Sequence, residues 1–161
     1  MDCLGSSYQL VLATDSNLLT VKSWFSDQQQ MLTWGGPNMY YPISDETFMS
    51  LLQESHLSSY CLLDPDNSVV AFGQFYLRLD RHHLGRLVVS PKHRNQGLVK
   101  KLIFGLLEMA VQINGQREAS LFVYKDNSPA LRAYSAIGFK TRIYPADLPP
   151  NMQDCLYMVL D

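Results

Sequence analysis

The distribution of apolar and polar residues divides the chain into short strands and amphipathic helices. Strand-like runs between turn residues lie at 8–13, 59–63, 69–79, 84–89, 119–124, 139–144 and 155–160. Apolar residues at three- to four-residue spacing predict helices near 17–25, from Ser44 to about Glu54, from Gly97 onward, and from Ser128 to Gly138. The chain is therefore predicted to combine about seven strands with about four helices.

The order of these elements determines the kind of sheet. The segment Asp64-Pro65-Asp66-Asn67 predicts a hairpin between two strands, because proline presets φ and Asx side chains bond their own backbone. The helix from Gly97 joins the strands at 84–89 and 119–124, and such a crossover connects parallel neighbours. We therefore expect one α+β domain over 1–161. Its central sheet would be mixed and mostly antiparallel, with one parallel pair, flanked by the helices.

Composition agrees with a globular chain and excludes two classes of protein. Of the 161 residues 47% are hydrophobic and 17% charged, and the formal net charge is −2. A disordered chain would be less apolar, and a protein that binds nucleic acid through bulk charge would be strongly basic. Apolar runs stay short of the roughly 20 residues that span a bilayer, and residues 1–5 lack the layout of a secretion signal. We expect a cytoplasmic protein without membrane or nucleic-acid partners.

The cysteines do not form a recognisable metal or disulfide pattern. Cys3, Cys61 and Cys155 are widely separated, odd in number, and show neither C-x-x-C nor a Cys/His spacing. We expect three reduced thiols and no bound metal.

Positive charge is concentrated in one stretch of this near-neutral chain. Between positions 78 and 101 lie seven of the 13 Lys and Arg residues, opposed within that stretch by Asp80: Arg78, Arg81, Arg86, Lys92, Arg94, Lys100 and Lys101. A solvated face is the ordinary explanation of such a cluster, unless a binding motif lies inside it.

A candidate anion cradle lies inside this stretch, where the strand ending at Val89 turns into the longest helix. The first N–H groups of a helix lack internal partners and carry positive potential, and Gly97 lets a ligand approach the backbone. An ordinary strand-to-helix turn fits the spacing equally well. The chain contains no G-x-x-x-x-G-K-[ST] and no G-x-G-x-x-G, so neither nucleotide loop is supported.

The same residues resemble a known family. The segment Arg94-Asn95-Gln96-Gly97-Leu98-Val99 is similar to the R/Q-x-x-G-x-G/A pyrophosphate loop of the GNAT superfamily of acyl-CoA-dependent N-acetyltransferases. Residues 127–139, from Asn127 to Gly138-Phe139, resemble the family's second signature, N-x-x-A-x-x-x-Y-x-x-x-G-F. The specific similarity covers residues 84–139, about a third of the chain. It implies a GNAT fold and acetyl transfer from acetyl-CoA to a primary amine by direct attack within a ternary complex.

The resemblance also implies cofactor contacts. Leu87, Val88 and Val89 correspond to the strand that hydrogen-bonds the pantetheine arm, the loop from Arg94 to Val99 to the pyrophosphate site, and Asn127 to a contact near the pantetheine. Val99 departs from the pattern, since a β-branched side chain stands where the family has Gly or Ala. With valine at this position, the start of the helix is expected to approach the diphosphate less closely, which would weaken cofactor binding.

Two residues become candidates for proton transfer. Tyr134 matches the family tyrosine that stands near the cofactor sulfur as general acid, and a neutral phenol can hydrogen-bond or protonate a departing thiolate. His83 falls where family members often carry a glutamate, and it is a candidate general base because histidine titrates near neutrality. A water chain to backbone carbonyls is an equally good candidate for the base.

The amine acceptor is not identified by the sequence. The loop over 34–42 has two glycines and several aromatic residues, so Trp34 and Tyr40 could form a substrate wall, although aromatic residues beside a turn also serve as core plugs. A protein N-terminus, a lysine, a polyamine, an aminoglycoside or another small amine all remain open. The rival hypothesis is a non-catalytic GNAT-fold module that binds acyl-CoA or a protein. A monomer or homodimer is expected, with 155–160 as a candidate edge strand.

Overall fold

The computed structural model describes residues 7–161 and contains one seven-stranded sheet. The strands lie in the order β1-β2-β3-β4-β5-β7-β6, and β4 with β5 is the parallel pair, every other neighbouring pair being antiparallel. Their bounds are β1 Gln9–Leu12, β2 Ser58–Leu63, β3 Val69–Arg78, β4 Arg81–Val89, β5 Ala119–Tyr124, β6 Lys140–Arg142 and β7 Cys155–Leu160. The predicted mixed sheet with one parallel pair is confirmed.

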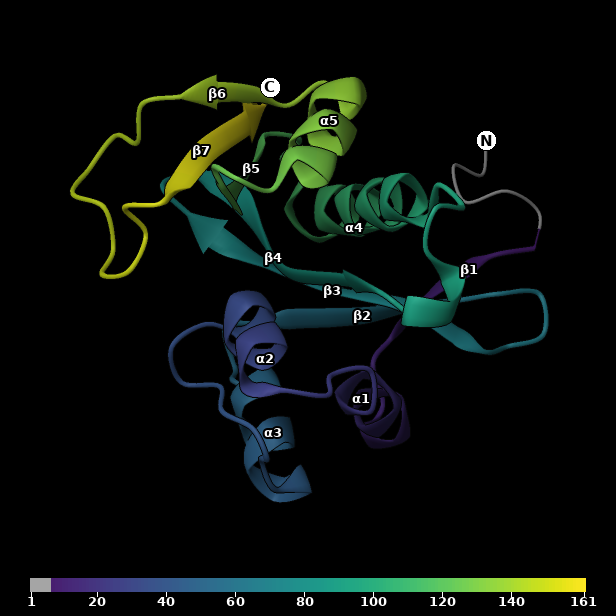
Figure 1. The fold of residues 1–161 in the computed structure, drawn as a ribbon. Coiled ribbons are helices and arrows are strands. Elements are labelled where there is room, and N and C mark those ends of the chain that lie inside the picture. Colours follow the sequence, from purple (N-terminus) through teal and green to yellow (C-terminus); the bar gives the residue numbers. More distant parts are fainter. Residues whose placement is uncertain (1–6) are drawn as a thin grey trace.

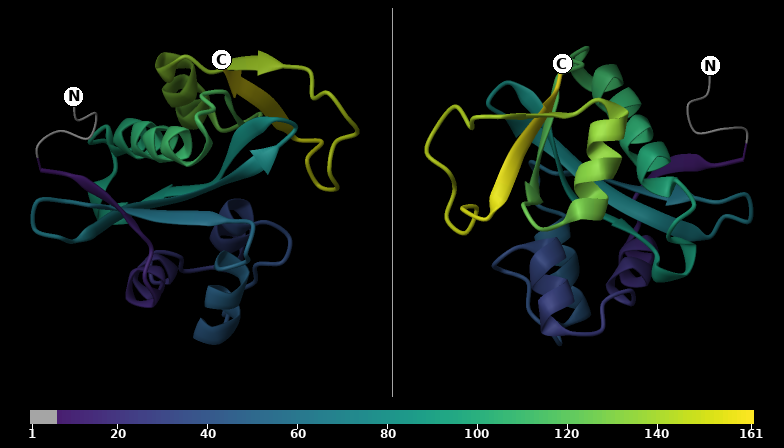
Figure 2. Two further views of the ribbon diagram at one scale, coloured as in Figure 1. Left: turned by 180° about the vertical axis from the view of Figure 1, so that it is seen from behind. Right: turned by 45° about the horizontal axis from the view of Figure 1, so that its top comes forward.

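Helices cover both faces of the sheet (Figure 1). On one face lie α1 Asp15–Lys22, α2 Gln28–Gly35 and α3 Asp45–Leu52; on the other lie α4 Leu98–Asn114 and α5 Ser128–Ile137. Figure 2 shows the same two layers from behind, with the long loop before β7 projecting beyond the sheet. A short 3₁₀ turn, η1 Pro91–His93, precedes α4.

Each face of the sheet has its own apolar core. Under α4, Leu102 and Leu106 pack with Phe75, Leu84 and Leu121 from three neighbouring strands, and all five are nearly inaccessible to water. On the opposite face the core combines Leu18, Met31, Phe48 and Phe72, one residue from each of α1, α2, α3 and β3. Burial of side chains of this size stabilises by roughly 1.5–3 kcal/mol each, so the two cores hold both helix layers against the sheet.

The helix α2 was not predicted from the sequence. Its residues, QQQMLTWG, carry a weak apolar pattern, with Met31 and Gly35 as the buried positions. Asp27 caps its start by accepting a hydrogen bond from the Gln30 amide at 2.8 Å. Packing of Met31 and the partly buried Trp34 against the sheet, rather than local periodicity, accounts for this helix.

The start of β4, the N-cap of α5 and the position of β7 in the sheet also differ from expectation. Strand β4 begins at Arg81, three residues before the predicted start, so both His82 and His83 lie within the sheet. Asn127, not Ser128, caps α5. The edge prediction for 155–160 is wrong, because β7 lies between β5 and β6 and the exposed strand β6 forms that edge instead.

The thiol prediction can be assessed for two cysteines. Cys61 and Cys155 are free and buried, whereas Cys3 and the start of the chain lie outside the described residues.

Within residues 7–161, no helix is both long and apolar enough to cross a membrane. The same part of the chain holds no group of three or more His, Cys, Asp and Glu side chains arranged to bind a metal ion.

Candidate active site

The parallel strands β4 and β5 separate shortly after they begin. They pair at His82, His83 and Leu84 of β4 and then diverge. A bulge follows in β4: Phe72 opposes Val88 but Gln74 opposes Gly85, so two residues of β4 stand opposite Gly73. Beyond Leu84, no strand among residues 7–161 pairs with the β5 side of β4. Backbone groups there are left available to an extended ligand.

The bulge depends on two local features. Arg86 adopts a left-handed backbone conformation, with φ of 49°. Across the ladder, a Cβ at position 73 would stand 2.7 Å from Leu87 Cδ2 and 2.8 Å from Leu106 Cδ1, so any larger residue would require these two leucine side chains to shift. Bulges bend a strand and increase its twist, which explains why β4 turns away from β5 at this point.

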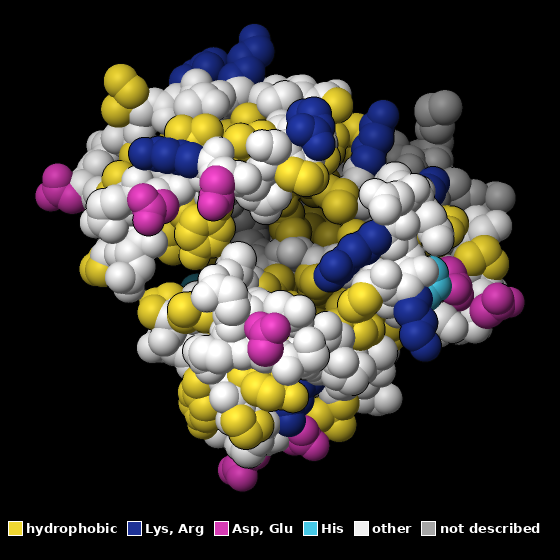
Figure 3. Space-filling view, viewed as in Figure 1, with side chains coloured by type: hydrophobic (Ala, Val, Ile, Leu, Met, Phe, Trp, Pro, Cys, Tyr) yellow, Lys and Arg dark blue, Asp and Glu magenta, His cyan; other side chains and the backbone are white. Residues whose placement is uncertain are grey.

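A cavity of about 820 Å³ opens between the separated strands. Figure 3 shows it as a hollow between the two helix layers, with apolar side chains on its walls. Leu84 to Val88 of β4 and Leu121 to Tyr124 of β5 line it, together with parts of α2 and the loop before β7. Of the predicted pantetheine strand, Leu87 and Val88 therefore face the cavity, whereas Val89 is buried and pairs with Ala71.

The predicted phosphate loop has the geometry of an anion cradle. Asn95 and Gly97 have positive φ, 64° and 73°, and Gly97 precedes α4 as its N-cap without any side-chain capping bond. Nothing lies within 4 Å of a Cβ built on Gly97, so the backbone faces open space. Of the loop residues Arg94 lines the cavity, while Asn95, Gln96 and Gly97 are exposed and Leu98 is buried.

Val99, the residue that departs from the family pattern, is turned towards the protein. Its side chain is partly buried and packs against the core beneath α4. A β-branched residue is compatible with helical φ and ψ, and a side chain held in the core does not fill the space outside the loop. The expected obstruction of the diphosphate is therefore not supported by the position of this side chain.

The cations do not all gather at this loop. Arg81 lies at the far end of β4, where it contacts the Asp161 carboxylate at 2.6 Å and donates to the Leu160 carbonyl. The Arg86 guanidinium turns beneath α2 and α3, where it donates to the carbonyls of Gly35 and Leu51 and to Gln74 Oε1. If the seven clustered cations are interpreted as one binding site around the loop, that interpretation is wrong for Arg81 and Arg86, whose side chains bind protein groups elsewhere.

Tyr134 and Asn127 both lie on the cavity wall. Asn127 accepts a hydrogen bond from the Ala130 amide at 3.3 Å and so fixes the start of α5 at the end of β5. Tyr134 packs edge-on against Phe139, with 6.2 Å between ring centres. Burial raises the pKa of the Tyr134 phenol to about 12, so the group is neutral and available as a hydrogen-bond donor.

His83 also faces the cavity but is held as a neutral imidazole. Its side chain is 3% exposed, its Nδ1 is hydrogen-bonded to Ser120 Oγ at 2.8 Å, and it packs on the rings of Tyr76 and Phe122. Burial, and secondarily the charge of Arg78, lower the pKa of His83 to about 3. Such a group does not store a proton at neutral pH.

The predicted acceptor wall is only partly assembled. Trp34 lines the cavity, yet its Nε1 donates to the Arg86 carbonyl at 2.8 Å and its ring stacks on Phe25 at 4.5 Å. Tyr40 is 48% exposed and is not among the residues that line the cavity. Trp34 therefore also packs against the hydrophobic core, as the alternative interpretation proposed.

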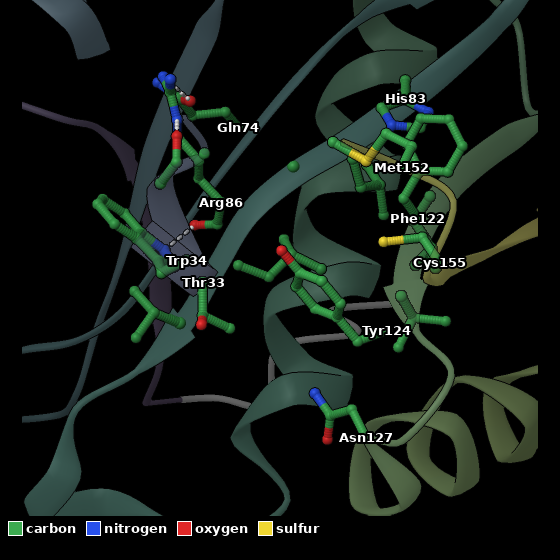
Figure 4. A pocket seen from close by; sticks show the side chains of 18 of the residues that line it. Thr33, Trp34, Gln74, His83, Arg86, Phe122, Tyr124, Asn127, Met152 and Cys155 are labelled. Carbon is green, nitrogen blue, oxygen red and sulfur yellow. Dashed lines mark hydrogen bonds between the residues drawn. The ribbon is translucent and has the colours of Figure 1, made fainter. Parts of the chain in front are cut away.

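Several cavity residues were not anticipated from the sequence. Figure 4 shows the Tyr124 hydroxyl and the Cys155 thiol pointing into the cavity from β5 and β7. Glu54, Arg78 and Met152 also line it, from three separate parts of the chain. The period-two pattern of β3 places Arg78 on the face of Gln74, but only the pairing of β3 with β4 brings that face to the cavity.

The sequence and the fold are similar to those of known proteins. Residues 21–139 match the family model described as Acetyltransferase (GNAT) family. The catalytic subunit NAA20 of the N-terminal acetyltransferase B complex of Arabidopsis thaliana is 35% identical over 57 residues, a match that covers 35% of this chain and 33% of that protein.

Two solved structures illustrate the similarity of fold. Spermidine N-acetyltransferase from Vibrio cholerae, in complex with CoA and spermine, superposes with a TM-score of 0.76 at 16% identity, covering 97% of this chain and 96% of that one. The ribosomal-protein-S18-alanine N-acetyltransferase from Escherichia coli has a TM-score of 0.67 at 20% identity, covering 95% and 92%.

The family match spans most of the chain, including the phosphate loop and the segment with Asn127 and Tyr134. The fold agrees over nearly the whole length of both structures, and the separated strands, the loop and the tyrosine meet in one cavity suited to acetyl-CoA as acyl donor. This protein belongs to the GNAT family of acetyltransferases.

Proposed function

We propose that the protein transfers the acetyl group of acetyl-CoA to a primary amine by direct attack within a ternary complex. The observation that carries the proposal is that one cavity is lined by the separated strands β4 and β5, by Arg94 of the phosphate loop, and by the Tyr134 phenol. Holding donor and acceptor together in one cavity supplies the positioning that a two-substrate reaction needs.

The donor would lie along the separated strands. Leu87, Val88 and Val89 would hydrogen-bond the pantetheine arm as an added strand, and Asn127 would contact it from the opposite side. The loop from Arg94 through Asn95, Gln96, Gly97 and Leu98 to Val99 would hold the pyrophosphate on the uncapped start of α4. Both ends of the donor then have a site of matching chemistry.

Tyr134 would act on the leaving sulfur. As the amine nitrogen bonds to the thioester carbon, the C–S bond breaks and the electron pair leaves on the thiolate. A phenol with a pKa of about 12 is more than three units weaker as an acid than a thiol near 8.5, so complete proton transfer is uphill by about 4–5 kcal/mol. Tyr134 would therefore stabilise the thiolate mainly by donating a hydrogen bond.

Proton removal from the amine is assigned to water rather than to His83 as a proton store. With a pKa of about 3, the imidazole is neutral and is too weak a base to retain the ammonium proton. Hydrogen-bonded to Ser120, it would orient water that passes the proton towards solvent along backbone carbonyls. His83 is thus a positioning residue in the proposed reaction.

A covalent acetyl-cysteine intermediate is less well supported. The Cys155 thiol lines the cavity, but burial, and next the nearby Asp154, raise its pKa. Thiolate is the nucleophilic form of cysteine, and these surroundings disfavour it. Direct attack by the amine needs no such group.

Two-substrate steady-state kinetics test this proposal. Acetyl-CoA and a panel of amines should give intersecting double-reciprocal plots, and Cys155→Ser should retain activity. Parallel plots that are lost with Cys155→Ser would establish a double displacement instead. Saturable CoA binding without amine-dependent thiol release would favour the non-catalytic module. The cytoplasmic location, the monomeric or dimeric state, and the absence of nucleic-acid and membrane partners remain predictions.

A further inference from the structure

At the end where β4 and β5 are still paired, the cavity has a floor of aromatic side chains with Arg78 among them. Strand register places Tyr76 opposite His83 and His83 beside Ser120, and Phe122 follows two residues along β5 on the same face. Tyr76, Arg78, His83 and Phe122 all line the cavity. Tyr76 and Arg78 share the sheet face of Gln74, whose side chain donates to the Leu52 carbonyl at the end of α3. This floor lies away from the phosphate loop, on the side left for the acceptor.

Arg78 is held on this floor by rings rather than by an acid. Its guanidinium carbon lies 5.5 Å from the ring centres of both Tyr76 and Phe122. Within residues 7–161 it makes no ion pair and no hydrogen bond to another residue. Stacking on two rings fixes the plane of the guanidinium while leaving its N–H donors for a ligand.

The other charged groups on the cavity wall have different positions or partners. Arg94 belongs to the phosphate loop, and Arg86 already donates to three protein oxygens. Glu54, the single carboxylate among the described residues that line the cavity, has a half-exposed side chain 3.8 Å from His56. Two guanidinium groups and one carboxylate therefore line this side of the cavity, and Arg78 is the guanidinium whose N–H donors have no acceptor among the described residues.

We propose that the acceptor is an amine that also carries a carboxylate, which Arg78 binds while the chain between the two groups crosses the Tyr76 and Phe122 rings. A guanidinium fork matches a carboxylate with two parallel hydrogen bonds. This assignment of substrate class rests on the proposed function. A polyamine, the kind of substrate named for the Vibrio cholerae enzyme, would instead place extra positive charge against Arg78.

The test measures equilibrium binding to the CoA-saturated protein by calorimetry, so that it does not depend on turnover. The ligands are glycine, β-alanine, 4-aminobutyrate and 6-aminohexanoate, each beside its uncharged carboxamide, with spermidine as the polycation. The series scans the distance between amine and carboxylate. The best-fitting acid should bind at least tenfold more tightly than its amide, and spermidine should bind more weakly than that acid.

Variants assign the preference to one side chain. Arg78→Gln should remove the acid-over-amide ratio while leaving amide binding and CoA affinity unchanged, and Arg78→Lys should retain part of it. Arg117→Gln is the matched control, because it removes one positive charge from an exposed residue outside the cavity lining and should leave the ratio intact.

The proposal is overturned by equal affinity for every acid and its amide, by tighter binding of spermidine than of any acid, or by a preference that survives Arg78→Gln. Turnover, followed separately as thiol release, distinguishes the two levels of the account. Amine-dependent release without a carboxylate preference refutes the substrate class alone. A carboxylate preference in binding without any release refutes the proposed function and leaves the Arg78 site established.

Discussion

A hydrogen bond from the Trp34 side chain to the Arg86 backbone joins α2 to the β4 bulge, and a second bond runs from the Arg86 side chain to Gly35. The Trp34 Nε1 donates to the Arg86 backbone carbonyl at 2.8 Å, and the Arg86 Nε donates to the carbonyl of Gly35, the next residue, at 3.1 Å. Arg86 is the bulge residue with positive φ. The helix α2 therefore fastens the segment whose distortion opens the cavity.

Trp34→Phe tests this connection. The variant keeps an aromatic ring against Phe25 but leaves a partly buried carbonyl without its donor. We expect the free energy of unfolding to fall by about 1–2 kcal/mol and CoA to bind more weakly, because the bulge is less firmly held. Urea denaturation and calorimetry measure the two effects. Trp24→Phe, at a cavity residue without such a hydrogen bond, should change both less.

Gly97→Ala tests the phosphate loop, with Gly115→Ala as a matched control. Both glycines flank α4, have φ above 70°, and face open space, so alanine costs each about 1 kcal/mol of backbone strain. Only at position 97 would the added methyl stand where phosphate oxygens are proposed to bind. CoA affinity should fall at least tenfold for Gly97→Ala and stay unchanged for Gly115→Ala. Equal affinities in the two variants would refute the loop assignment.

Val99→Ala tests whether the departure from the family pattern weakens cofactor binding. Because the Val99 side chain packs against the core, its truncation should lower stability by about 1 kcal/mol and alter CoA affinity by less than threefold. Thermal denaturation and a CoA titration provide the measurements. A tenfold gain in affinity would show that the valine does obstruct the diphosphate.

His83→Asn tests the neutral imidazole through the pH dependence of stability. The folded-state pKa of His83, about 3, lies below its ordinary value of 6.5, so between these values the unfolded chain binds a proton that the folded chain does not. The free energy of unfolding therefore falls as the pH drops from 6.5 towards 3, by about 1.4 kcal/mol per pH unit. Above pH 6.5 this loss is absent. Urea denaturation between pH 7.5 and 4.5 should show a shallower acid loss for His83→Asn. Parallel curves would contradict the assignment.

Much of the fold could be predicted because its signals are local. The apolar face of α4 and the turn at residues 64–67 depend on neighbouring residues, and the crossover between β4 and β5 follows from the order of elements. The insertion of β7 between β5 and β6 could not be predicted, since strand order is a non-local property. Helix α2 was missed for a related reason, because its packing rather than its periodicity stabilises it.

The site divides in the same way. Gly97, Asn127 and Tyr134 belong to continuous segments, so their resemblance to the family's motifs was enough to make them candidate site residues. Arg78 and Tyr124 carry no motif, and they reach the cavity only through the registers of β3 with β4 and of β5 with β7. Residues that reach the cavity through strand pairing can therefore be found only from the structure.

Amine-dependent release of CoA thiol by Tyr134→Phe, compared with the wild-type protein and Tyr124→Phe, tests the central claim most directly. Both variants remove one phenol oxygen from the cavity wall. The account predicts that Tyr134→Phe lowers kcat at least tenfold with unchanged acetyl-CoA affinity, while Tyr124→Phe changes kcat less than threefold. Wild-type kcat in Tyr134→Phe, or thiol release that is independent of the amine, would contradict it.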